Sequence, residues 1–310
     1  MDNLCHTLVG AACSEAGLKR RTRFASATLM IAANLPDLDV LVFATRVPSV
    51  SFRRGWTHGV LGDLLLPVIL TGVMMAIDRA RPRRDATVAA VSDRASWPAL
   101  LALSYIGVAS HVLLDLLNNY GVRLLMPLSN RWFYGDTLFI VDPWMWAALG
   151  GGVWLARRRG RAKPARLALV VAIAYIAVML VSARAARSVV LDAWRGQHGS
   201  DPRAAMVGPV FLDPFRKDVI VDRGDGYVRG TFRWLPRSVR FDEAVIPSRA
   251  GSPEVEAAQR DPSVRAFLVW ARFPYYEIET ARSGTRVVVS DMRFGRLMAT
   301  TSVTVSSSSP

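Results

Sequence analysis

An imidazole and a carboxylate stand four residues apart in the apolar sequence YIGVASHVLLDLLNNYG, which covers residues 105–121. Residues at this spacing share one face of an α-helix, so His111 and Asp115 are expected to point in the same direction. Such a pair can bind a metal ion, or it can form a hydrogen bond inside a helical bundle. The surrounding residues 97–117 are apolar over a length that can cross a bilayer, so the pair is expected inside a membrane.

Other ionisable residues occur in similarly apolar surroundings, where they are energetically costly and usually serve a function. Counted at about 1.5 Å per helical residue from the nearest basic loop, most of them lie about 18–25 Å above the cytoplasmic face, and His58 lies at roughly 30 Å. A metal ion in this layer would satisfy the imidazole nitrogens and neutralise the carboxylates. The predicted metal ligands are His6, Asp37, His58, His111, Asp115 and Asp142.

The sequence ANLPDLDVL predicts a break in its span, because Pro36 has no amide hydrogen and disfavours helical geometry at Leu35. On an intact helix Asp37 and Asp39 would point about 200° apart, whereas an unwound segment can aim both at one centre. Four other interpretations stay open. Asp37 and Asp39 could end a helix before an outer loop, since aspartate is common in turns, and His6 could be an interfacial residue. Asp142 precedes a proline and fits a helix N-cap, and Thr57 could cap a helix that has His58 in its first turn.

Composition indicates an integral membrane protein, since 51% of the residues are hydrophobic although the formal net charge is +14. The mean hydropathy is +0.23. We predict an α-helical polytopic membrane protein, with about six membrane-embedded helices in residues 1–185. The expected spans are 3–18, 24–45, 58–77, 97–117, 138–156 and 166–183.

Basic loops alternate with loops that are poor in lysine and arginine, and cytoplasmic loops are the basic ones. The basic connections are KRRTR at 19–23, the 78–94 loop and RRRGRAKPAR at 157–166. An even number of spans then places the N-terminus and the C-terminal region together on the outer side of the membrane. Nucleic-acid binding is not expected, because the basic residues follow topology and are not interleaved with aromatic residues.

Residues 186–310 change character and predict a smaller, mainly β extramembrane domain. DVIVDRGDGYVRGTFRWL and TRVVVSDMRFG read as strands with glycine-centred turns, and AFLVWARFPYYEIE reads as a strand pair broken by Pro274. A helix is expected around residues 253–260, and the Ser-rich tail is expected to be disordered. No catalytic group is evident in this domain, so we expect it to cover the membrane site or to bind the polar part of a substrate.

Four motifs, taken together, resemble those of the YdjM-like family, described as LexA-regulated, inner-membrane-associated, metal-dependent hydrolases. They are Met1-Asp2 with His6 and Gly10, then Asn34-Leu35-Pro36-Asp37-Leu38-Asp39, then Arg54-Gly55-Trp56-Thr57-His58, and then His111-x-x-x-Asp115. The resemblance spans roughly residues 1–145, and it implies a multi-pass protein of the bacterial inner (plasma) membrane, with both termini on the periplasmic side. Many members have a histidine where this chain has Arg53, which removes one possible ligand.

A more distant similarity is to the zinc-dependent phospholipase C group, whose ligands follow the order His, Asp, His, His-x-x-x-Asp. This chain offers His6, Asp37, His58, His111 and Asp115 in that order. The resemblance implies hydrolysis of phosphate esters or phosphodiesters by a divalent metal, with zinc as the expected ion. It also implies Asp37 or Asp39 as ligand or general base. Arg54, at the outer mouth of the site, could hold a phosphate anion bidentately, although an arginine at an interface more often meets lipid headgroups.

Two classes of function follow from these residues. The first is a membrane-bound metal-dependent hydrolase whose partners are the lipid bilayer and a lipid-borne or small phosphate ester at the outer leaflet. The second is a transporter or proton relay that uses the same His/Asp layer, and a non-catalytic scaffold is a further alternative. A transporter needs polar access from both faces, and the inner half of the spans is almost wholly apolar, which favours the enzyme.

Overall fold

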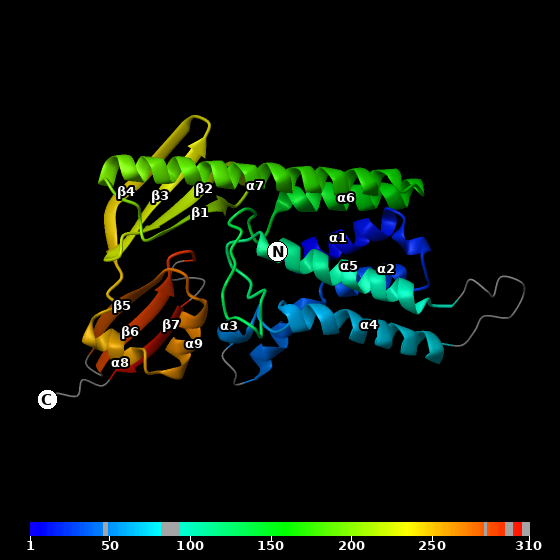
Figure 1. Ribbon diagram of the computed structural model, residues 1–310, viewed down its shortest axis with the longest axis horizontal. Helices are drawn as coiled ribbons and strands as arrows, with labels where there is room; N and C mark the ends of the chain where they lie inside the picture. Colours follow the sequence, from blue (N-terminus) through cyan, green and yellow to red (C-terminus); the bar gives the residue numbers. More distant parts are fainter. Residues whose placement is uncertain (46–48, 82–93, 282–283, 295–299, 306–310) are drawn as a thin grey trace, which may run out of the picture. The chain divides into compact units, whose positions relative to one another are not determined.

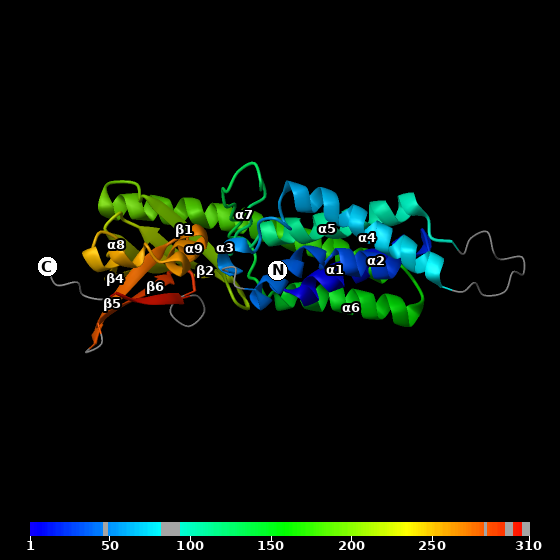
Figure 2. The same ribbon diagram turned by 90° about the horizontal axis from the view of Figure 1, so that it is seen from below.

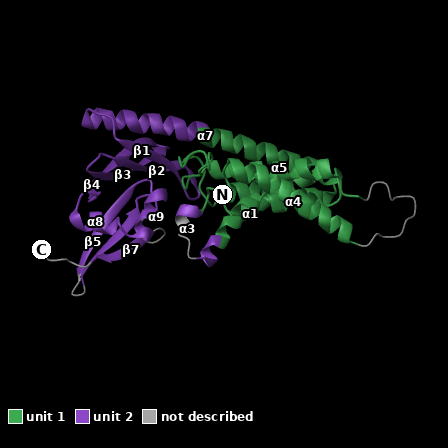
Figure 3. Cartoon of the chain, turned by 60° about the horizontal axis from the view of Figure 1, so that its bottom comes forward, with its two compact units in different colours: residues 1–41, 53–180 green, residues 42–52, 181–310 purple. Residues whose placement is uncertain are grey.

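The chain folds into two compact units, which Figure 3 distinguishes by colour. The computed structural model describes residues 1–45, 49–81, 94–281, 284–294 and 300–305. The first unit comprises residues 1–41 and 53–180, and the second comprises residues 42–52 and 181–310. Apolar helices dominate the first unit and two β-sheets dominate the second, as the sequence predicts. The predicted disordered tail, residues 306–310, and most of the 78–94 loop lie outside the described residues.

Helices of the first unit pack side by side around α5 (Figure 1 and Figure 2). α5 contacts α2 and α4, and α1 contacts α2 and α6. Two apolar clusters fill the spaces between them, one joining α1, α5, α6 and α7 and the other joining α2, α4 and α5. The helices are α1 (Asn3–Glu15), α2 (Ala25–Ala32), α4 (Val60–Ala80), α5 (Trp97–Leu116), α6 (Pro143–Arg159) and the first half of α7 (Lys163–His198), with a short 3₁₀ helix η1 (Leu18–Arg20).

Three helices in the described part of the chain are long and apolar enough to cross a membrane, namely α4, α5 and α7. A fourth candidate is a bent pair, in which α2 meets the 3₁₀ helix η2 (Leu35–Ala44) at 52°. The remaining two predicted spans correspond to α1 and α6, which have 13 and 17 residues. The described helices therefore support three spans, or four with the bent pair, out of the six predicted.

The bend occurs where the sequence predicts a break. α2 ends before Pro36, and Asn34 satisfies groups that the interrupted helix leaves open. The Asn34 side-chain amide donates hydrogen bonds to the Met30 carbonyl at 2.8 Å and to Thr7 Oγ1 at 2.9 Å. The chain then continues into η2, which carries Asp37 and Asp39.

Two antiparallel sheets form the core of the second unit. The first contains β1 (Ala204–Val210), β2 (Asp213–Asp222), β3 (Gly226–Trp234) and β4 (Arg237–Pro247) in sequence order. The second contains β5 (Pro274–Ala281), β6 (Gly284–Asp291) and β7 (Thr300–Val305). One face of the first sheet packs against the second half of α7, and a cluster that includes Met206, Phe273 and Met292 joins the two sheets.

Short helices α3 (Ser49–Phe52), α8 (Pro253–Ala258) and α9 (Pro262–Trp270) complete this unit. The helix expected around residues 253–260 is confirmed by α8. The strand expected at the start of AFLVWARFPYYEIE is wrong, because that segment lies in α9 and only the part from Pro274 is a strand. Asp261 caps α9 by accepting a hydrogen bond from the Ser263 amide, and Pro262 occupies its first position, so the local start signal outweighs the β propensity of the residues that follow.

Candidate metal centre

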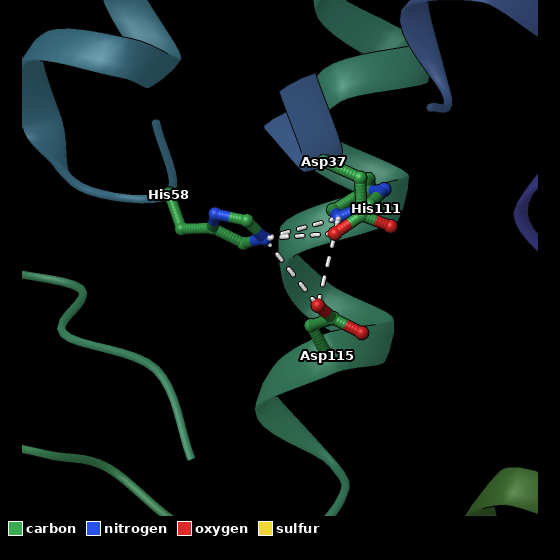
Figure 4. A group of neighbouring side chains, drawn as sticks. All are labelled: Asp37, His58, His111 and Asp115. Carbon is green, nitrogen blue, oxygen red and sulfur yellow. Dashed lines mark hydrogen bonds and ion pairs between the residues drawn. The ribbon is translucent and has the colours of Figure 1, made fainter. Parts of the chain in front are cut away.

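Four side chains from three parts of the chain converge on one point inside the first unit (Figure 4). His58 Nε2 lies 3.1 Å from His111 Nε2 and 3.4 Å from Asp115 Oδ2, and His111 Nε2 lies 3.5 Å from the same oxygen. Asp37 Oδ1 lies 3.9 Å and 3.8 Å from the two Nε2 atoms. Ligands about 2.0–2.2 Å from a tetrahedral zinc ion are separated by about 3.3–3.6 Å. These residues therefore form a possible metal-binding site, and the predicted convergence of the four is confirmed.

Hydrogen bonds at Nδ1 of His58 and of His111 determine whether the Nε2 atom of each ring donates or accepts. His111 Nδ1 lies 2.8 Å from the Ala33 carbonyl oxygen, which can only accept, so Nδ1 carries the hydrogen. Thr57 Oγ1 donates to Asp39 Oδ2 at 3.3 Å, so it accepts from His58 Nδ1, which lies 2.9 Å away. In neutral imidazoles both Nε2 atoms are then acceptors. Two lone pairs and two carboxylate oxygens face one another, an arrangement that a cation would satisfy.

Burial makes this convergence costly without a cation. His58, His111 and Asp115 have no exposed surface, and Asp37 is 7% exposed. Asp37 Oδ1 is buried and accepts no hydrogen bond within the described residues. Acceptors that are withdrawn from water without donors destabilise a protein, and a divalent ion compensates several of them at once. The donor set of two nitrogens and two oxygens suits zinc.

A close helix contact positions His111. Gly107 lies one turn before His111 on α5, and a Cβ atom there would come within 2.9 Å of the Ala33 amide nitrogen and closer still to Ala32 Cβ. The absence of a side chain at Gly107 thus lets α5 approach the end of α2 closely enough for the bond from His111 to Ala33.

We expect Gly107→Ala to lower the free energy of unfolding by about 1–3 kcal/mol, because the new methyl group must push α2 away. The displacement should also weaken metal binding through His111. The measurement is the thermal unfolding of the detergent-purified chain with and without added zinc. Gly72→Ala in α4 is the matched control, since a Cβ there meets nothing within 4 Å. Equal behaviour of the two variants would contradict the packing argument.

Asp39 lies behind His58 and does not join the group of four. Its Oδ2 accepts hydrogen bonds from the Arg54 amide at 2.7 Å and from Thr57 Oγ1, and lies 3.6 Å from His58 Nδ1. Its Oδ1 accepts from Arg53 Nε at 3.2 Å. Thr57 is not a helix N-cap, because α4 begins at Val60 after Gly59. Asp39 and Thr57 therefore orient the His58 ring.

Arg54 is buried beside the carboxylate of Asp115. Its Nη2 lies 3.1 Å from Asp115 Oδ2, and its Nη1 donates to Asn118 Oδ1 at 3.1 Å. The guanidinium also stacks on Tyr120, with its carbon 4.5 Å from the ring centroid. The predicted phosphate-binding group thus contacts the Asp115 carboxylate. Asn118 was not predicted, because it lies beyond the end of α5, where helical spacing gives no signal; its side-chain amide lies 3.5 Å from Asp115 Oδ1.

His6 borders the four converging side chains without being one of that group. Its ring stacks on His111 with centroids 3.8 Å apart, and its Nε2 lies 3.4 Å from Asp115 Oδ1. The ring is fully buried, and neither nitrogen has a hydrogen-bond partner in the described structure. The amino group of Met1 contacts the same Asp115 oxygen. The two oxygens of Asp115 therefore face different histidines.

Asp142 caps α6 and is not brought to the centre. Its Oδ1 accepts hydrogen bonds from the amides of Trp144 and Met145 at 3.1 Å, and its Oδ2 accepts from the Tyr175 hydroxyl at 3.0 Å. Of the two interpretations that the sequence leaves open for this residue, the structure shows the N-cap, followed by Pro143 at the first helical position.

Comparison with known proteins gives one match. The family model described as YdjM inner membrane protein matches residues 1–186, more than half of the chain. No curated protein and no solved structure matches. The matched residues include the whole candidate metal centre.

Proposed function

The chain belongs to the YdjM inner membrane protein family, and on that premise we propose that it is a metal-dependent hydrolase of the inner membrane. We infer that it cleaves phosphate esters or phosphodiesters on a lipid-borne substrate at the outer leaflet. The observation that carries this proposal is the contact of two imidazole Nε2 atoms, both acceptors, 3.1 Å apart beside two buried carboxylates.

Asp37, His58, His111 and Asp115 would hold the ion, with zinc as the metal that their donor atoms favour. A bound divalent metal supplies electrophilic polarisation of a phosphoryl oxygen and activation of water near neutral pH. Arg54 balances the charge of Asp115, and Asp39 keeps the His58 ring in the tautomer that leaves Nε2 free.

A proton relay is the second candidate function, and the same contact supports it. If one Nε2 takes up a proton it can donate to the other, and Asp37 and Asp115 lie within 4 Å to receive it. Such a relay needs no metal, so metal content separates the two proposals.

The test uses the full chain purified without chelators. Elemental analysis should find at least one divalent ion per chain. Purified protein in nanodiscs should release phosphate or headgroup from lipid-linked phosphate esters, and this activity should be lost with a chelator and restored by zinc. A metal-free protein that zinc does not activate would refute the hydrolase and favour the relay.

We also propose the finer topology that the basic loops indicate, with six membrane-embedded helices and both termini outside. An alkaline phosphatase reporter fused after Arg187 should then be active, and one inserted within residues 79–94 should be inactive. A cytoplasmic reporter at the same two places should give the reverse pattern. Activity of the phosphatase at 79–94 would contradict the proposed orientation, on which the depths counted from the sequence depend.

A further inference from the structure

Apolar side chains are exposed at one end of the first sheet of the second unit, where turns join neighbouring strands. The antiparallel order β1-β2-β3-β4 brings the β1–β2 turn and the β3–β4 turn to this same end. Phe215 beside the first turn is 56% exposed, and Leu235 in the second turn is 73% exposed. Phe211 and Leu212, in the first turn, are also about half exposed, at 46% and 51%. We call this group of four residues the hairpin edge.

A contact with α7 shows which part of that helix lies beside the hairpin edge. The indole nitrogen of Trp234, directly before Leu235, donates a hydrogen bond to Ser182 Oγ at 2.8 Å. Ser182 and the 67% exposed Val181 lie where the apolar part of α7 gives way to Arg184 and Arg187. The hairpin edge therefore lies beside the residues of α7 at which the apolar part of this helix ends, and both belong to the second unit.

Exposed arginines accompany the apolar side chains. Arg184 and Arg187 on α7, and Arg233 and Arg237 beside the β3–β4 turn, are all exposed. The turn between β2 and β3, at the opposite end of the sheet, has the sequence Asp222-Arg223-Gly224-Asp225-Gly226 and contains no apolar residue. Exposed apolar side chains and arginines thus occur together at the end of the sheet that lies beside the end of the apolar part of α7. Aromatic and aliphatic groups next to arginines are typical of protein surfaces at the headgroup layer of a bilayer.

We propose that the hairpin edge inserts into the membrane surface, with Phe215 and Leu235 at the boundary between headgroups and acyl chains. Arg184, Arg187, Arg233 and Arg237 contact the lipid phosphates. The occupant of this surface is therefore an anionic phospholipid leaflet, the one in which the apolar part of α7 ends. This proposal needs only that α7 crosses the membrane, and it does not depend on the hydrolase.

The test places an environment-sensitive fluorophore on the full chain in nanodiscs that contain anionic phospholipid. Leu235→Cys reports on the hairpin edge, and Asp225→Cys at the opposite turn is the matched control. The unmodified chain measures background labelling, since Cys5 is buried and Cys13 is half-buried. The label at residue 235 should be quenched by nitroxide lipids and should show blue-shifted emission. The label at residue 225 should be quenched only by aqueous iodide.

A charge-reversal variant tests the contribution of the arginines in the same experiment. Arg233→Glu with Arg237→Glu should reduce the lipid quenching at residue 235, and the loss should be larger in anionic than in neutral nanodiscs. Iodide quenching at residue 235 equal to that at residue 225 would overturn the proposal. Protection at 235 that occurs only in nanodiscs holding two chains would also overturn it, because the occupant would then be a second copy of the chain.

Discussion

Asp115→Asn is expected to remove bound metal and hydrolysis together. The substitution keeps the shape of the side chain and removes the charge that would offset the cation. Asp115 Oδ2 lies within 3.5 Å of the Nε2 atoms of both His58 and His111, so it occupies the middle of the donor set. Loss of a residue that hydrogen-bonds to a metal ligand lowers metal affinity by about 10–100-fold. Loss of a ligand itself should lower the affinity by more than that. Elemental analysis and the lipid-phosphate assay measure the two effects.

Instability of the variant has to be separated from loss of metal, because Asp115→Asn leaves Arg54 buried without its carboxylate. Breaking one side of a buried pair costs about 3–5 kcal/mol. The double variant Asp115→Asn with Arg54→Gln removes both charges of the pair and should fold while still lacking metal. Asp142→Asn is the matched control, since asparagine also caps helices and Asp142 contacts Tyr175 away from the centre. Metal retained in the Asp115 variants would refute the proposed ligand set.

Depth counted from the sequence predicted which side chains converge better than it predicted what each of them contacts. His111 and Asp115 were placed correctly because a helix fixes their shared face. His58 was counted at a greater depth than the others, although its imidazole converges with their side chains; it lies in a turn before α4, which begins at Val60. Asp142 was counted at the same level as the others, but its carboxylate caps α6. Depth gives no information about direction around a helix axis, so it could not separate a ligand from a cap.

Local signals predicted much of the fold, and tertiary contacts decided the rest. Pro36 predicted the break between α2 and η2, and alternating residues with glycine turns predicted β2, β3 and β6. α7 was predicted to end near residue 183, but it continues to His198 because Ala186, Val190 and Trp194 form a stripe that packs on the first sheet. That stripe has the spacing of a helical face, yet its partner residues follow only later in the chain. The role of Arg54 was likewise hidden, since its partners Asp115 and Asn118 are distant in sequence.

Asp39→Asn should weaken metal binding by about 10–100-fold, because an amide cannot replace the negative charge that favours a hydrogen on His58 Nδ1. Asp39 Oδ2 lies 3.6 Å from that nitrogen, and Thr57 Oγ1 connects the two. Without the carboxylate, His58 can adopt the tautomer with its hydrogen on Nε2, which cannot bind a metal. The measurement is zinc affinity by competition with a chromogenic chelator, as a function of pH.

Activity at saturating zinc then separates positioning from general base catalysis by Asp39. A residue that orients a ligand should lose affinity and recover most of its turnover once the site is filled. A general base should keep its zinc and lose about 10²–10⁴-fold in turnover. We expect the first pattern, because both oxygens of Asp39 already accept hydrogen bonds from Arg53, Arg54 and Thr57 and the residue is only 4% exposed. Unchanged affinity with lost turnover would assign the base to Asp39 and leave the tautomer of His58 to Thr57 alone.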